Sequence, residues 1–136
     1  MLRYFAGANG ETDVVDCPGC FAWYELITTD TAAAEAFYAK VVGRGAQDAS
    51  TPDLAYTVFT AGNASVCGLM DLPEEGRKMG ARPRWMGYVV VNDVDATADR
   101  IKRLGGAVCV PPTNSNIWMR AIFYPSRCNS LSLLMG

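Results

Sequence analysis

The sequence predicts an α+β domain in which two tandem β-α-β-β-β modules form an incomplete barrel. A strand pattern followed by a capped helix occurs twice, and three further strand patterns follow each helix. An offset of 63 residues, the distance from Asp30 to Asp93, superposes the two halves and also places Gly43 on Gly106. The length of 136 residues fits one domain and leaves little room for two independent ones.

The first module is expected over about residues 20–72. Residues 21–28 are rich in aromatic and β-favouring side chains and predict a strand. Asp30 is a good N-cap for a helix over residues 31–42, which Gly43 and the glycine two residues later should end. The apolar positions at helical spacing are Ala34, Tyr38 and Val41. Strands are expected over residues 54–60 and 64–70, with a short strand over 47–50 before them.

A linker rich in proline, glycine and charge is expected over about residues 73–83. The second module then covers about residues 84–136, beginning with a strand over 85–91 and a cap at Asp93. Its helix should cover residues 94–104 and bury Val94, Thr97, Ile101 and Leu104 on one side. Strands are expected over residues 107–110, 117–124 and 130–135. Residues 1–16 are expected to be an irregular lead-in to a single domain over 17–136.

The overall charge and hydropathy indicate a cytoplasmic protein. A net charge of -2 gives no electrostatic reason to expect nucleic acid or an anionic membrane as a partner. The longest apolar runs are too short to span a bilayer, and the N-terminus does not resemble a signal peptide. The five cysteines are an odd number, which favours reduced thiols over a disulfide framework. Cys17-Pro18-Gly19-Cys20 precedes a strand and is interpreted as the turn that starts the domain, not as a redox motif.

The absence of histidine is the most informative feature of the composition. Histidine is the usual general base near neutral pH and the commonest metal ligand. Its absence therefore removes Ser-His, Cys-His and His-metal chemistry together.

The alternation of side chains along each first strand predicts which residues line a cleft. On the first strand, Trp23 and Glu25 should face the cleft, because Leu26 should face the helix. By the repeat, Trp23 corresponds to Met86, and Glu25 corresponds to Tyr88. These four residues are the predicted ligand-binding residues, together with Trp118 and Arg120 from a later strand.

Glu25 is the leading candidate for chemistry. In a cleft it could bind a cationic or hydrogen-bonding group, or act as a base. It could equally be a structural partner of Arg120 or of a backbone group, or be exposed if the strand phase is wrong. Trp23, Met86, Tyr88 and Trp118 could form an aromatic and thioether wall for flat ligands, or simply fill the core. Arg120 could hold a carboxylate or a phosphate, or pair with Glu25.

Four segments of the chain resemble the vicinal oxygen chelate superfamily, which contains glyoxalases, bleomycin-resistance proteins and dioxygenases. The segments are W-Y-E-L-I-T-T-D-x-A-A-A-x-A-F-Y (23–38), V-C-G-L-M (66–70), W-M-G-Y-V-V-V-N-D-V-D-A (85–96) and L-G-G-A-V (104–108). The resemblance covers about 110 residues, from Cys20 to the end. It implies a barrel of paired modules and, in the enzymes, a divalent metal held by His and Glu from the first and last strands of each module.

In this sequence the positions that the resemblance assigns to metal ligands hold Trp23, Met86 and, in the last strands, residues near Gly68 and Ser132. None of these is a usual ligand for a hard divalent ion, so neither a metal nor another cofactor is expected. The leading prediction is therefore a metal-free protein of the glyoxalase/bleomycin-resistance type that binds, in the barrel cleft, an apolar or aromatic small molecule that could also be cationic.

Two other classes of function stay open. One is an enzyme, either a metal-dependent lyase or dioxygenase of the same superfamily or a metal-free enzyme that uses Glu25 as base. The other is a structural or regulatory dimer. Family members often pair through exposed sheet edges, and half of the chain is hydrophobic, so a homodimer is also expected.

Overall fold

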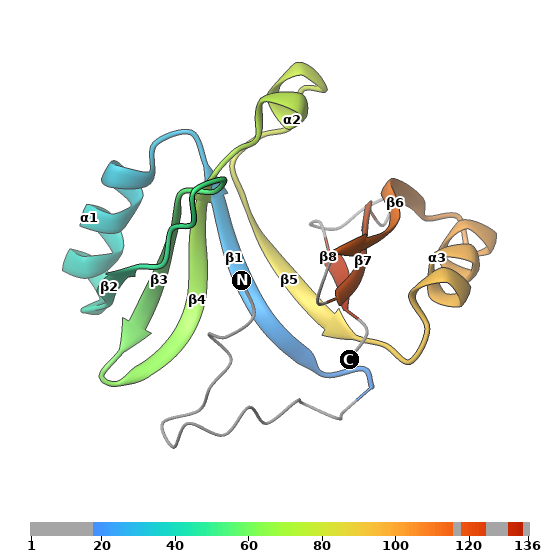
Figure 1. The fold of residues 1–136 in the computed structure, drawn as a ribbon, viewed down its shortest axis with the longest axis horizontal. Helices are drawn as coiled ribbons and strands as arrows, with labels where there is room; N and C mark the ends of the chain where they lie inside the picture. The colour runs from blue at the N-terminus through green and yellow to red at the C-terminus, as the bar shows by residue number, and fades with distance from the viewer. Residues whose placement is uncertain (1–17, 116–117, 125–130, 135–136) are drawn as a thin grey trace. The chain divides into compact units, whose positions relative to one another are not determined.

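The computed structural model describes residues 18–115, 118–124 and 131–134 (Figure 1), with side chains as far as residue 109. The chain divides into two compact units. One consists of Tyr24–Trp85, and the other contains residues 18–23 and the chain from Met86 onward. The predicted lead-in, residues 1–16, lies outside the described residues.

The unit Tyr24–Trp85 contains a mixed sheet with one long helix on one face. Its elements are β1 (Phe21–Thr28), which begins in the other unit, α1 (Thr31–Val42), β2 (Gly45–Asp48), β3 (Tyr56–Ala61) and β4 (Ala64–Asp71). The strand order is β2-β3-β4-β1; β3 pairs antiparallel with both β2 and β4, whereas β4 pairs in parallel with β1. The predicted strand 21–28 and helix 31–42 are confirmed to the residue, and the short strand expected at 47–50 begins at Gly45.

Helix α1 begins and ends where its capping residues require. The Asp30 carboxylate accepts a hydrogen bond from the Ala33 amide at 2.9 Å, and Gly43 adopts a left-handed conformation (φ 66°) that ends the helix. Figure 1 shows α1 along one side of the sheet. Ala34 and Tyr38 pack against a buried cluster of Leu26, Phe59, Cys67 and Leu69. Val41 was expected on this face but is 61% exposed, because it lies in the last turn, outside the packed cluster.

The segment between the modules contains a helix that the sequence did not predict. Pro73 immediately precedes helix α2 (Glu74–Lys78). Proline has no backbone N–H, so it is unfavourable inside a helix but tolerated at its start. Glu74 and Glu75 lie in its first turn and Arg77 and Lys78 in its last, which matches the direction of the helix dipole. The expectation of an irregular linker is therefore wrong for these five residues.

The other unit also combines a mixed sheet with one helix. Its elements are β5 (Arg84–Val90), α3 (Val94–Arg103), β6 (Ala107–Ser115), β7 (Trp118–Tyr124) and β8 (Leu131–Leu134). Strand β5 pairs in parallel with β8, which pairs antiparallel with β7, and β7 pairs antiparallel with β6. The chain before β1 joins this unit, because the Gly19 amide donates to the Val90 carbonyl at 2.8 Å. Mixed strand pairing together with helices α1 and α3 confirms the α+β class.

Two expectations for this unit need correction. Strand β6 continues to Ser115 instead of ending at Val110, because irregular pairing between Val110 and Thr113 carries the strand past two prolines. Leu104 was expected on the buried side of α3 but is 78% exposed, since it is the residue that caps the helix end. Val94 and Ala98 are the buried residues of α3. The helical spacing predicted this for Val94.

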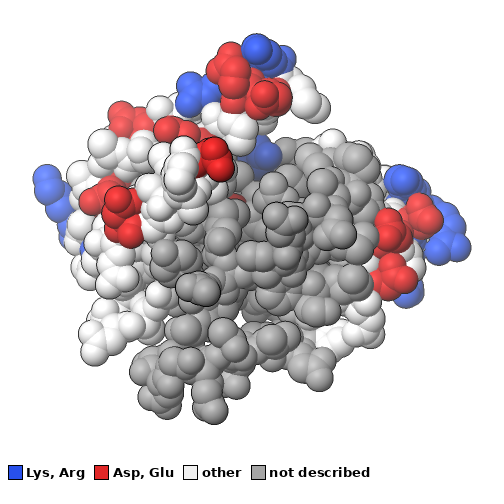
Figure 2. Space-filling model, in the orientation of Figure 1, with Lys and Arg blue, Asp and Glu red and all other residues white. Residues whose placement is uncertain are grey.

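The outer surfaces of α1 and α3 differ in character. Most exposed residues of α3 are charged, and Figure 2 shows both signs mixed over this helix. The charged ones are Asp95, Asp99, Arg100, Lys102 and Arg103. Helix α1 exposes the large apolar side chains of Phe37, Val41 and Val42, in addition to Glu35 and Lys40. In the part of the chain that the structure describes, no helix is long and apolar enough to cross a membrane.

Candidate functional site

Glu25 lies on the face of the sheet opposite α1. Its neighbour Leu26 packs in the cluster beneath α1, so strand alternation directs the carboxylate of Glu25 to the other side. Only 2% of Glu25 is exposed. The predicted strand phase is therefore correct, and the alternative that Glu25 is a solvated surface residue is wrong.

Tyr56 binds the Glu25 carboxylate from two strands away. The Tyr56 hydroxyl donates a hydrogen bond to Glu25 Oε1 at 2.7 Å, and Tyr56 is itself buried. Glu25 lies on β1 and Tyr56 on β3, so their bond crosses β4, where Gly68 is the register partner of Glu25. Buried Val58 and Ile27 lie on the same strands near this pair. The result is a hydrogen-bonded carboxylate and phenol on a largely apolar face.

Tyr56 is a site residue that the sequence prediction missed. Its pattern gives a usable signal, because Tyr56, Val58 and Thr60 alternate along one strand and so must share a face. The sequence alone does not place that strand two positions from β1, so the alternation did not connect Tyr56 with Glu25.

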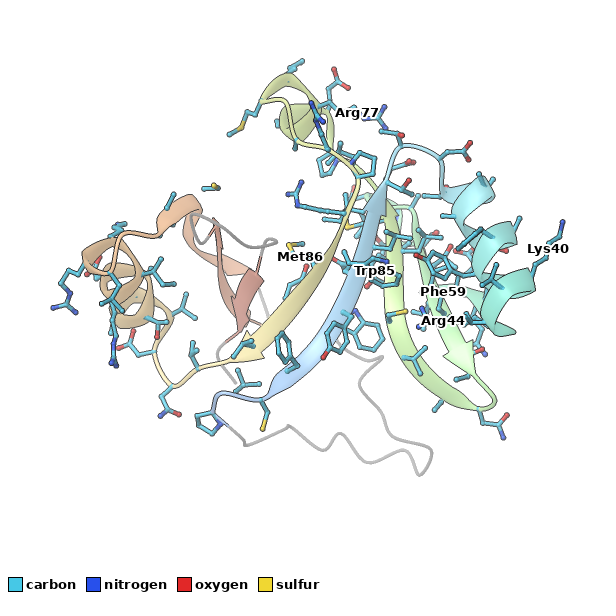
Figure 3. The ribbon with its side chains drawn as sticks, turned by 180° about the vertical axis from the view of Figure 1, so that it is seen from behind. Lys40, Arg44, Phe59, Arg77, Trp85 and Met86 are labelled. Atoms are coloured by element: carbon cyan, nitrogen blue, oxygen red, sulfur yellow. The ribbon has the colours of Figure 1, made fainter. Side chains whose placement is uncertain are left out.

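A second polar cluster lies on the face beneath α1 (Figure 3). The Arg44 guanidinium donates a hydrogen bond to the Cys67 sulfur at 3.0 Å. The guanidinium carbon also lies 5.5 Å from the Tyr38 ring centre, 5.8 Å from that of Phe59 and 5.7 Å from that of Trp85. These distances suit cation-π attraction, and the Trp85 indole nitrogen ties the rings together by donating to the Tyr38 hydroxyl at 3.0 Å.

Two opposing effects act on the pKa of the Cys67 thiol. Burial raises its pKa above the ordinary value of 9.0, because the thiolate would lose its hydration, and the positive charge of Arg44 partly lowers the pKa again. Cys67 and Cys109 are free, whereas Cys20 is disulfide-bonded. The expectation of reduced cysteines throughout is therefore wrong for Cys20. That expectation rested on composition, while a disulfide depends on the approach of two sulfur atoms in the fold.

The remaining predicted ligand-binding residues belong to the other unit. Trp23, Met86 and Tyr88 are all buried there, at 9%, 2% and 5% exposure. The side chains of Trp118 and Arg120 lie outside the described residues, so their predicted roles stay predictions.

The side chains at the family's metal positions do not fit a divalent ion. Trp23 offers an indole and Met86 a thioether, neither of which binds a hard cation, and Gly68 offers no side chain. Within the described residues, no three His, Cys, Asp or Glu side chains gather closely enough to hold a metal ion.

Comparison with known protein families identifies the family to which the chain belongs. Residues 21–128 match the model of the Glyoxalase/Bleomycin resistance protein/Dioxygenase superfamily. Because this match covers most of the chain, the protein belongs to that superfamily.

Relatives of known name are longer than this chain. "Putative glyoxylase CFP32" of Mycobacterium bovis is 35% identical over 91 residues, which are 65% of this chain and 34% of that protein. "Anthracycline biosynthesis protein DauV" of Streptomyces sp. (strain C5) is 31% identical over 115 residues, which are 85% of this chain and 41% of that protein. The chain thus spans about a third to two fifths of the length of these relatives.

Solved structures support the fold. A methylmalonyl-CoA epimerase from Streptomyces coelicolor superposes with a TM-score of 0.55 at 16% identity, covering 88% of this chain and 96% of the epimerase. The methylmalonyl-CoA epimerase from Mycobacterium tuberculosis superposes with a TM-score of 0.54 at 15% identity, covering 86% and 87%. At such low identity the similarity concerns the fold alone.

Proposed function

We propose that this protein binds a small apolar or aromatic molecule, including cationic ones, without a metal, and that Glu25 is the polar anchor of the site. The observation that carries the proposal is the buried hydrogen bond between Glu25 and Tyr56. Glutamate is almost never fully buried unless it is paired, and apolar residues of similar size often stabilise a fold as well or better. A carboxylate on an apolar sheet face is therefore better explained by recognition than by stability.

The proposed site also includes the apolar residues predicted from the sequence. Trp23, Met86 and Tyr88, which are buried in the other unit, stay the predicted apolar ligand-binding residues. Large aromatic and thioether side chains suit flat ligands, and aromatic rings also attract cations. A relative named for the biosynthesis of anthracyclines, which are polycyclic aromatic compounds, supports an aromatic ligand.

Titration of tryptophan fluorescence with benzyltrimethylammonium and with neutral benzyl alcohol tests the proposal. We expect benzyltrimethylammonium to bind more tightly, and Glu25→Gln to weaken it by about tenfold, since a hydrogen bond to a charged group contributes about 1.5–3 kcal/mol. Binding of benzyl alcohol should change little in the same variant.

Glu35→Gln is the matched control, because it removes an exposed carboxylate on α1, the helix on the opposite face of the sheet from Glu25. It should leave both affinities unchanged. Absence of binding across a broad panel of aromatic amines and neutral aromatics would contradict the proposal.

A metal-free enzyme with Glu25 as base is the second candidate. The apolar surroundings of Glu25 favour it, because active-site carboxylates are often placed in such environments. Turnover of an oxo-aldehyde-thiol adduct or of a catechol, lost in Glu25→Gln, would establish this function in place of simple binding. Pairing with a second copy stays a prediction, to be measured by light scattering.

A further inference from the structure

We propose that Tyr56 positions Glu25 by reaching across Gly68, and that this arrangement takes the space of the family's metal ligand in the first module. The consequence for ligand binding rests on the proposed function, whereas the packing relationship between the three residues does not.

Strand register places the three residues in line. Glu25 on β1 lies opposite Gly68 on β4, and Gly68 lies opposite Val58 on β3. Tyr56 lies two residues before Val58, opposite Met70, so its side chain shares a face with Val58 and reaches Glu25 diagonally over β4. The hydroxyl can therefore meet the carboxylate only by passing over the position of Gly68.

Gly68 leaves the room that the tyrosine ring fills. A Cβ atom built at Gly68 would overlap the Oη and Cζ atoms of Tyr56 and lie 3.2 Å from its Cε1. Gly68 is not among the glycines with positive φ, so its backbone conformation is one that other residues adopt readily. A glycine within a strand normally weakens the strand, because it has no side chain to pack. At position 68 the glycine is needed because the Tyr56 ring occupies the space of a side chain.

The tyrosine is held firmly at its backbone. Its carbonyl accepts from the Ala49 amide at 2.9 Å, and its amide donates to the Ser50 hydroxyl at 3.1 Å. Only 4% of Tyr56 is exposed, so a ring displaced from Gly68 would have to move within packed surroundings. A side chain at position 68 and the present position of Tyr56 are therefore mutually exclusive.

This exclusion gives a physical reason for the absence of a ligand at position 68. A carboxylate or imidazole ligand there would begin with a Cβ atom in the space of the Tyr56 ring. Instead, a phenol hydroxyl in that space donates a hydrogen bond to Glu25. Tyr56 thus orients the Glu25 carboxylate by a hydrogen bond, a role that a bound cation has in metal sites.

A double-mutant cycle, with urea unfolding measured on the whole chain, tests the packing relationship. We expect Gly68→Ala to lower the unfolding midpoint strongly in the wild-type background and less in Tyr56→Phe, which removes the overlapping Oη atom but keeps Cζ. In Tyr56→Ala the same substitution should be neutral or raise the midpoint. If Gly68→Ala alone fails to fold, Gly68→Ala/Tyr56→Ala should recover a cooperative transition.

The positioning role is tested with the benzyltrimethylammonium titration. Tyr56→Phe should reduce the preference for this cation over benzyl alcohol about as much as Glu25→Gln does, and the double variant should be no worse than either single one. A merely structural tyrosine would change stability without changing that preference.

Two results would overturn the inference. One is an equal loss of midpoint for Gly68→Ala in the wild-type and Tyr56→Ala backgrounds. The other is an unchanged cation preference in Tyr56→Phe when Glu25→Gln loses it. If no probe binds to any variant, the proposed function fails while the unfolding cycle still decides the packing relationship.

Discussion

The two faces of the sheet in Tyr24–Trp85 each carry a charged group, held by different kinds of partner. Beneath α1, Arg44 lies among three aromatic rings and donates to a thiol. On the opposite face, Glu25 accepts from a phenol hydroxyl that crosses a whole strand to reach it. Arg44 differs in its partners from Arg77, Lys78 and Lys102, which form ion pairs with nearby carboxylates.

The difference reflects what each ion needs when it leaves water. A guanidinium is planar and weakly hydrated, so it can rest on aromatic faces and keep its charge without a carboxylate. A carboxylate accepts hydrogen bonds only and must have donors aimed at it. Broad apolar contact thus surrounds Arg44, whereas a directed hydrogen bond from Tyr56 holds Glu25. Substitutions should damage the two faces in correspondingly different ways.

Removal of the Phe59 ring, which lies against Arg44, should have the largest effect on stability. Phe59 is fully buried, so Phe59→Ala should lower the free energy of unfolding by about 3–5 kcal/mol through lost apolar contact and a cavity. Val58→Ala, at the neighbouring position on the opposite face, removes fewer atoms and should cost less. Denaturant unfolding of both variants measures the comparison, and a larger loss for Val58→Ala would show that the Glu25 face is the principal core.

Replacement of Arg44 should have an intermediate effect. Arg44→Met keeps an unbranched side chain among the rings but removes the charge, and it should cost about 1–2 kcal/mol of unfolding free energy. Arg44→Lys keeps the charge without the planar stack and should fall between methionine and wild type. Equal stability of all three proteins would mean that the charge contributes nothing on this face.

Alkaline pH should have the smallest effect and should act through Cys67. Burial raises the pKa of this thiol, so above about pH 9 the unfolded chain loses a proton that the folded chain retains. The unfolding free energy should therefore fall as pH rises through this range. Urea unfolding at pH 8 and pH 10 should show a shallower fall in Cys67→Ala than in wild type. Identical slopes would contradict a raised pKa.

Local sequence signals predicted the elements of the first half closely, because their determinants are local. Asp30 and Gly43 set the ends of α1 through hydrogen bonds and backbone conformation that neighbouring residues alone decide. The phase of β1 also followed from simple alternation, which correctly placed Leu26 toward the helix and Glu25 away from it. Helix α2 was missed because the prolines and glycines around it masked five residues with favourable charges at both ends.

The hydrogen bond between Tyr56 and Glu25 could not be predicted from the sequence, for a different reason. Tyr56 lies 31 residues further along the chain, and the contact depends on a strand order that no local pattern contains. The role of Gly68 was hidden in the same way, since the space it leaves is filled by a residue from another strand. Arg120 was considered as one possible structural partner of Glu25, and its side chain lies outside the described residues.

The packing of Tyr56 over Gly68 makes the two positions depend on each other. A side chain at position 68 and the tyrosine ring in its present place would occupy the same space. The effect of a substitution at position 68 therefore depends on the residue at position 56. Tolerance of a side chain at position 68 is thus a property of the pair, which neither residue determines alone.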